Sequence, residues 1–153
     1  MKLHMKQGVF AAVACLLLLA MSTTSARAQW GHCRDSTLRG GYGFTITGQI
    51  LAGPAAGQVA GVAMTTFDGE GNLAQVDQVV HSGNPPAVQW RPATGTYTLN
   101  EDCTGTMQID FTDGSPSLHL NIVVVRGGRE IRTVVVNPFT AITSFGTKRD
   151  SPL

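Results

Sequence analysis

Residues 118–136 read LHLNIVVVRGGREIRTVVV, and their pattern is the clearest indication of how the chain folds. The first eight residues place a large aliphatic side chain at every second position, whereas His119 and Asn121 fall between them. A period of two is typical of a strand with one buried and one exposed face. Arg126-Gly127-Gly128-Arg129 then supplies turn residues before a second β-favouring run, 130–136. The stretch therefore predicts a β-hairpin.

The rest of the chain repeats this pattern of short β-favouring runs separated by glycine, proline, Asn and Asp. Tyr42, Phe44 and Ile46, for example, alternate with smaller or polar residues. No segment keeps a 3.6-residue period, so we expect no long helix. The expected strands are 38–51, 58–67, 73–81, 88–91 continued by 95–99, 106–111, 118–125, 130–136 and 144–149. Pro92 interrupts the fourth run and predicts a bulge or a sheet edge there.

Eight short strands joined mostly by hairpin-length turns predict an all-β domain built as an antiparallel meander. Closure of such a meander removes the unpaired groups at its edges. We therefore expect a single eight-stranded barrel, which is wide enough to be filled by side chains or to hold one small ligand. The alternative is a two-sheet β-sandwich.

The N-terminal 28 residues have the pattern of a cleaved signal peptide. Lys2 and Lys6 precede an apolar run from Gly8 to Met21, and the segment ends in Ala26-Arg27-Ala28. Such a run is shorter than the roughly 20 residues that a membrane-spanning helix needs. We expect residues 1–28 to be removed, leaving a barrel domain at 29–153 with no membrane span, in a secreted or periplasmic protein.

Two cysteines remain in the expected mature chain, Cys33 and Cys103. An even pair in an exported protein predicts a disulfide, here between the new N-terminus and a turn about 70 residues later. A cysteine nucleophile is the alternative, but no histidine lies close to Cys103 in the sequence and both flanks resemble turns.

Charge argues against nucleic acid as a partner. Removal of Lys2, Lys6 and Arg27 leaves eight basic residues against ten acidic ones, a net charge of about −2 with neutral histidines. Binding to phosphates requires a concentrated positive field. The densest group of basic residues is Arg126, Arg129 and Arg132, and the acidic Glu130 lies among them.

Several phrases together resemble a group of small secreted bacterial proteins of unknown function. They are LRGGYGF at 38–44, TFDGEGN at 66–72, GTYTLNEDCTG at 95–105, EIR at 130–132 and GTKR at 146–149. The resemblance implies a fold like that of the allene oxide cyclase barrel, an eight-stranded calycin-like barrel. In plants that barrel hosts a cyclase acting on an unstable fatty-acid epoxide, but no functional residue of it can be placed on this sequence. The resemblance thus implies a fold and no activity.

No catalytic or metal motif is present, and we expect no cofactor. The histidines are far apart in sequence, so a metal site would have to be assembled by the fold. The loop Asp68-Gly69-Glu70-Gly71-Asn72 offers three oxygen-bearing side chains, fewer than calcium needs. Asp77 is expected to face solvent. If it instead pointed inward, it would be the best candidate for a buried functional carboxylate, with Arg132 as its hypothetical partner.

The preferred functional hypothesis is a non-catalytic barrel that binds a small apolar molecule or an extracellular partner. Alternatives are an allene oxide cyclase-like isomerase or cyclase acting on a reactive lipid, and a structural or self-assembling surface module. Aromatic residues and an adaptable methionine would line the pocket. The candidate ligand-binding residues are Tyr42, Phe44, Met64, Trp90, Tyr97 and Phe111. The sequence does not determine the oligomeric state or the ligand.

Overall fold

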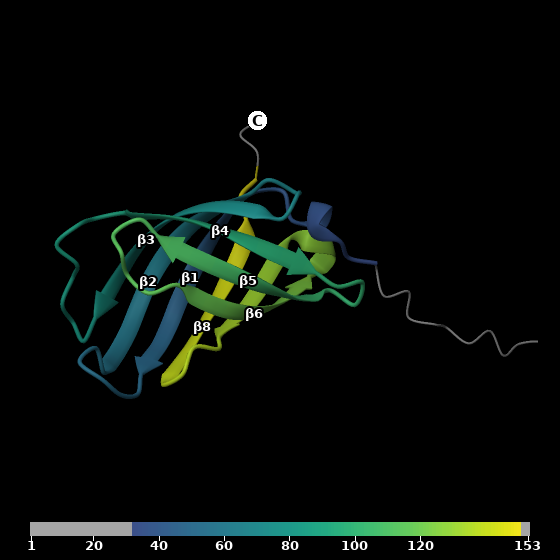
Figure 1. The fold of residues 1–153 in the computed structure, drawn as a ribbon. Helices are drawn as coiled ribbons and strands as arrows, with labels where there is room; N and C mark the ends of the chain where they lie inside the picture. Colours follow the sequence, from purple (N-terminus) through teal and green to yellow (C-terminus); the bar gives the residue numbers. More distant parts are fainter. Residues whose placement is uncertain (1–31, 151–153) are drawn as a thin grey trace, which may run out of the picture. The chain divides into compact units, whose positions relative to one another are not determined.

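A computed structural model describes residues 32–150, which form one closed antiparallel barrel of eight strands (Figure 1). The expected leader, 1–28, lies outside the described residues, and its removal stays a prediction. Two short 3-10 helices, η1 and η2, accompany the strands. The elements are η1 Asp35–Thr37, β1 Gly40–Ile50, β2 Gly57–Phe67, β3 Asn72–His81, β4 Arg91–Leu99, β5 Thr104–Phe111, β6 Leu118–Val125, η2 Arg126–Gly128, β7 Glu130–Val135 and β8 Thr140–Lys148.

Each strand pairs with its neighbours in sequence, and β8 returns to pair with β1. The closing register runs from Tyr42 opposite Lys148 to Ile50 opposite Thr140. Closure confirms the barrel and shows that the sandwich alternative is wrong. It also leaves no open edge in the sheet, so every strand has two bonded neighbours.

Alternation along the strands places the core inside the barrel. Leu120, Ile122 and Val124 on β6 are buried, while His119 and Asn121 face outward, as the period of two predicts. Tyr42 and Phe44 on β1 are buried in the same way.

One end of the barrel is closed by η1 and the aromatic residues beneath it. The ring of Phe67 packs edge-on against Tyr42 and Tyr97, with centroids 5.3 and 5.0 Å apart. The Tyr97 hydroxyl lies 3.0 Å from the carbonyl oxygens of both Asp35 and Leu38, and Leu38 is fully buried. These contacts hold η1 against this closed end.

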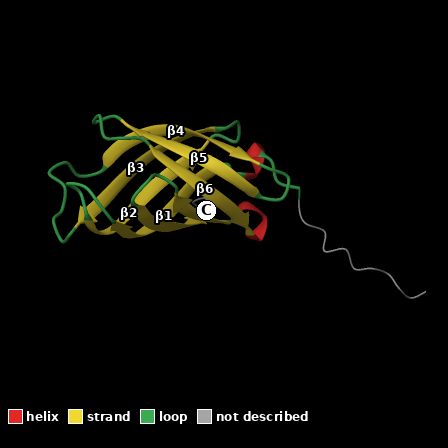
Figure 2. Cartoon of the chain, turned by 60° about the horizontal axis from the view of Figure 1, so that its bottom comes forward, coloured by secondary structure: helices red, strands yellow, loops and turns green. Residues whose placement is uncertain are grey.

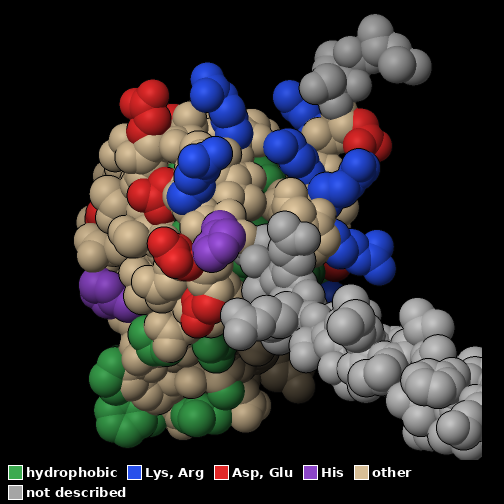
Figure 3. All heavy atoms as spheres, turned by 90° about the vertical axis from the view of Figure 1, so that its right-hand side faces the viewer, with side chains coloured by type: hydrophobic (Ala, Val, Ile, Leu, Met, Phe, Trp, Pro, Cys, Tyr) green, Lys and Arg blue, Asp and Glu red, His purple; other side chains and the backbone are tan. Residues whose placement is uncertain are grey.

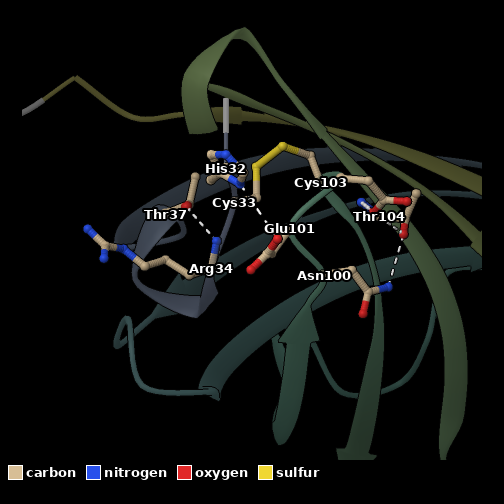
Figure 4. The surroundings of a disulfide bond; sticks show 9 residues. His32, Cys33, Arg34, Thr37, Asn100, Glu101, Cys103 and Thr104 are labelled. Atoms are coloured by element: carbon tan, nitrogen blue, oxygen red, sulfur yellow. Dashed lines mark hydrogen bonds and ion pairs between the residues drawn. A yellow bond between two sulfur atoms is a disulfide. The ribbon is translucent and has the colours of Figure 1, made fainter. Parts of the chain in front are cut away.

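The disulfide fastens the same end, as expected. Cys33 and Cys103 are bonded with their Cα atoms 4.9 Å apart, which joins the segment before η1 to the β4–β5 turn (Figure 4). The Cys33 amide also donates to the Glu101 carbonyl oxygen at 3.1 Å.

The structure corrects two expected strands. The fourth run does not break at Pro92: β4 is continuous from Arg91, and residues 88–90 belong to the preceding loop. Pro92 is tolerated because it is only the second residue of the strand, where a missing N–H donor costs little. The last strand begins at Thr140, four residues earlier than expected, because it pairs with β1 as far as Ile50.

No helix within residues 32–150 is long and apolar enough to cross a bilayer. The loops between β1 and β2, β3 and β4, β5 and β6, and β7 and β8 gather at the end opposite η1 and η2 (Figure 2). We call this the open end.

Candidate ligand-binding cavity

A cavity of about 780 Å³ lies inside the open end of the barrel. Inward-facing positions of all eight strands supply most of its wall, and these side chains are largely aliphatic or aromatic. They include Phe44, Val59, Ala63, Ile109, Phe111, Leu120, Val135 and Ile142. Cavities of about 300–1,000 Å³ with apolar walls are typical of small-molecule sites.

The cavity reaches the surface through the loops. Val88, which is 66% exposed, lines the same space as Ala63, which is 5% exposed. Pro116 of the β5–β6 loop and Pro138 of the β7–β8 loop also lie at its edge. The cavity is therefore bordered by loops at the open end as well as by the strands.

An ion pair is built into the wall between β3 and β4. Asp77 and Arg91 are directly opposite in the register of these strands. The guanidinium donates from Nε to Oδ1 at 3.1 Å and from Nη2 to Oδ2 at 2.9 Å. The carboxylate side chain is 4% exposed and the arginine 26% exposed. Paired hydrogen bonds of this kind compensate a buried carboxylate for the loss of its hydrogen bonds to water.

Arg91 is held in place by further contacts at the mouth of the cavity. Its guanidinium lies 3.6 Å from the centroid of the Phe111 ring, a cation–π contact. Nη1 donates to the Ser115 hydroxyl at 3.4 Å and lies 3.8 Å from a carboxylate oxygen of Asp113. The backbone N–H of Ser115, its side chain and Arg91 together lower the pKa of the Asp113 carboxyl, which therefore stays charged at neutral pH.

Uncharged polar side chains also lie in the apolar wall, among them Gln75, Thr133 and Ser144. Gln75 accepts a hydrogen bond from Thr65 at 2.7 Å through Oε1. Among residues 32–150, no acceptor is bonded to its Nε2, so this amide can donate to a molecule in the cavity. Thr133 and Ser144 share a hydrogen bond of 2.7 Å across β7 and β8. The wall thus offers a few polar groups among many apolar ones.

His81 adds a titratable group at the end of β3. Its Nε2 atom is buried and has no hydrogen-bond partner among the described residues. The residue lines the cavity together with Val79. A buried nitrogen without a partner is costly, so a ligand that supplied one would gain from that contact.

The structure separates the six candidate ligand-binding residues into groups. Phe44 and Phe111 line the cavity. Tyr42 and Tyr97 pack at the closed end around Phe67 and are absent from the cavity wall.

Met64 lies between the buried residues Ala63 and Thr65, so alternation places it on the outer face of β2. Trp90 ends the β3–β4 loop and is 53% exposed. Ligand binding by the six residues stays a prediction, and only two of them meet in one space.

Asp77 faces inward, contrary to expectation, and its partner is not Arg132. Arg132 lies on the outer face of β7, where it contacts Glu130 and stacks over the Phe145 ring. Its neighbours Ile131 and Thr133 take the inward positions of that strand. Since Phe67 and Leu73 are paired and both buried, counting by two from Leu73 would have placed Gln75 and Asp77 inside.

No group of three or more His, Cys, Asp or Glu residues that could hold a metal occurs within 32–150. In the loop 68–72, which was considered for calcium, the Asp68 carboxylate makes hydrogen bonds within the loop itself. It accepts them from the backbone N–H groups of Glu70 and Asn72 and from the Asn72 side chain. The Asn72 amide is the largest cause of the lowered pKa of Asp68.

The sequence matches no protein family, and no curated protein matches it. Among solved structures, a redesigned β-barrel is similar with a TM-score of 0.48 and 13% identity, covering 76% of this chain and 95% of that one.

Proposed function

We propose that this protein is a non-catalytic binding protein that holds one small, mainly apolar molecule in the open end of its barrel. The observation that carries the proposal is the cavity of about 780 Å³, whose wall is largely aliphatic and aromatic. Burial of apolar ligand surface against such a wall supplies about 25 cal/mol per Å². The volume suits a ligand of drug or lipid-fragment size.

The polar groups of the wall indicate the ligand's chemistry. Asp77 and Arg91 neutralise each other, so the wall has no unpaired charge deep inside. The amide nitrogen of Gln75 and the hydroxyls of Thr133 and Ser144 suit a carbonyl or hydroxyl on the ligand. We therefore expect an uncharged molecule with a single polar group.

The proposal also includes a location outside the cytoplasm. The Cys33–Cys103 disulfide suits an oxidising compartment such as the periplasm or the extracellular space. The signal-peptide pattern of residues 1–28 supports the same location.

Native mass spectrometry of the protein purified from its source tests the function. We expect a one-to-one complex with a small molecule that is released by organic solvent. Protein that carries nothing and also fails to bind any apolar probe would contradict the proposal. The intact mass would at the same time show whether residues 1–28 are removed.

A lipid isomerase or cyclase like allene oxide cyclase is the second candidate. It is supported by Asp77 and Gln75, which place a carboxylate and an amide in an otherwise apolar wall. Product analysis with an unstable fatty-acid epoxide generated in the presence of the protein tests it. A change in product ratio or chirality that is lost in Asp77→Asn and Gln75→Leu would favour this candidate, and unchanged products would exclude it.

A further inference from the structure

The most exposed large apolar side chains lie in loops of the open end, where Val88 also lines the cavity. Within residues 32–150, every large hydrophobic residue that is at least half exposed belongs to one of three open-end loops. We call these residues the apolar rim: Leu51 at 55%, Val88 at 66%, Trp90 at 53%, Val136 at 50% and Phe139 at 67% exposure. Other exposed hydrophobic residues, on the outer faces of the strands, reach 46% at most.

The three loops that carry the apolar rim contain no charged residue. They are 51–56, 82–90 and 136–139, and each includes proline. At the closed end, by contrast, all three turns are charged, with Asp68 and Glu70 in the first, Glu101 and Asp102 in the second and two arginines in the third. Charged side chains of both signs are visible over that end (Figure 3).

The three loops also form one continuous stretch of the rim. The Leu51 amide donates to the Phe139 carbonyl oxygen at 2.7 Å, which joins the β1–β2 and β7–β8 loops. The Ser82 amide donates to the Gln58 carbonyl oxygen at 2.8 Å, which joins the β3–β4 loop to the start of β2. The fourth loop, between β5 and β6, completes the circle and carries Asp113.

We propose that the apolar rim docks the open end onto a neutral lipid surface. The mouth of the cavity would then face the acyl chains, and an apolar ligand would pass between lipid and barrel without crossing water. Tryptophan and phenylalanine side chains partition into the interface of a bilayer. The absence of charge in these loops fits zwitterionic lipid, since anionic lipid attracts basic segments.

A fluid surface suits the rim better than a second protein does. The five side chains belong to three loops at the open end, and each of these loops also lines the cavity, through Ala55, Val88 and Pro138. A rigid partner would therefore have to fit three loops that border an opening. A second copy of this chain would have to close two such openings against each other. Acyl chains can adapt to both the side chains and the opening.

Quenching of Trp90 by brominated phosphatidylcholine vesicles tests the docking. The exported protein is used with Trp30→Phe, which leaves Trp90 as the one tryptophan of the two in the sequence. We expect its emission to shift to shorter wavelength and to be quenched by bromine on the acyl chains. The partition coefficient should be insensitive to ~1 M NaCl, because screening affects only charged contacts.

Two substitutions in this chain provide a matched comparison. Phe139→Ser should lower the partition coefficient at least tenfold, whereas Phe145→Ser, which removes a 38% exposed phenylalanine from the outer face of β8, should change it less than twofold. Unchanged denaturation midpoints show that both variants fold. The N-terminal segment is the same in all these proteins and cancels in the comparison.

Three results would overturn the docking. They are an unquenched Trp90, an equal loss of binding in both variants, and binding restricted to phosphatidylglycerol vesicles and abolished by salt. A dimer in solution that Phe139→Ser dissociates, with no vesicle binding, would instead make the apolar rim a protein interface. The docking goes beyond the proposed ligand binding, and the two can be tested separately. Binding of an apolar probe in the absence of vesicles reports on the cavity alone, whereas quenching by vesicles reports on the docking.

Discussion

Asp77 and Arg91 face each other across β3 and β4 and form a two-point ion pair in the wall of an apolar cavity. The pair is asymmetric. The aspartate is buried, whereas the arginine also contacts Ser115, the Phe111 ring and solvent at the mouth. Loss of Asp77 and loss of Arg91 should therefore lower the free energy of unfolding by different amounts.

Arg91→Met should lower the free energy of unfolding by about 3 kcal/mol, because it leaves the Asp77 carboxylate buried without a partner. Asp77→Asn should cost less, since Arg91 still reaches water and Asp113. The double variant should be more stable than Arg91→Met alone. Urea denaturation of the three variants measures these differences, and equal losses in both single variants would contradict the asymmetry.

The two tyrosines of the chain should resist alkaline titration. Burial is the main cause of the raised pKa of both Tyr42 and Tyr97, whose ordinary value is about 10. Ultraviolet absorbance at pH 10 should show a smaller phenolate fraction in the folded protein than in denaturant, where about half of the tyrosine side chains are ionised. The sequence contains no other tyrosine, so the signal belongs to the closed end alone.

The same shifts have a consequence for stability. Because the folded pKa values exceed the unfolded ones, the stability that these groups contribute is fully present below pH 10 and is lost as the pH rises through the folded values. Tyr42→Phe should reduce that alkaline loss. A phenolate fraction at pH 10 that is as large in the folded protein as in denaturant would show that the rings are not packed as described.

Removal of the disulfide should weaken the domain by about 4 kcal/mol, because the bond closes a loop with a sequence separation of 70 residues. Cys33→Ser combined with Cys103→Ser should unfold at a lower urea concentration than the oxidised protein. Addition of a reductant should bring the unchanged protein to the same midpoint and leave the double variant unaffected. Two reactive thiols in exported protein would contradict the bond itself.

Gly146 is needed to make room for the Phe44 ring. A Cβ at Gly146 would lie 2.5 Å from two ring atoms of Phe44, whereas a Cβ at Gly43 would have nothing within 4 Å. Gly146→Ala should therefore cost about 2 kcal/mol and push the ring into the cavity. Gly43→Ala serves as the control and should change stability little. Equal midpoints for the two variants would show that the ring has space to move.

The sequence predicted the barrel because its strands keep a period of two and its turns are short. The hairpin 118–136 shows this best, since its alternating residues occupy the inward and outward faces as expected. The disulfide was predictable from the cysteine count. The break predicted at Pro92 was wrong, because the sequence alone does not distinguish a proline near the start of a strand from one that interrupts it.

The cavity could not be predicted from the sequence, and the reason is physical. Tyr42 and Phe44 are both aromatic and two positions apart on one strand, yet one packs at the closed end and the other lines the cavity. Their roles depend on position along the barrel axis and on how η1 fills one end. Arg91 was missed because its contact with Asp77 follows from the β3–β4 register.

Titration with the uncharged fluorophore N-phenyl-1-naphthylamine tests most directly whether the open end holds an apolar molecule. Ala63 lines the cavity, and Ala60 lies three residues earlier on the outer face of the same strand. We expect saturable binding of one probe per chain, a loss of affinity of at least tenfold in Ala63→Phe, and unchanged affinity in Ala60→Phe. Absent binding, or equal affinity in the two variants, would contradict the account.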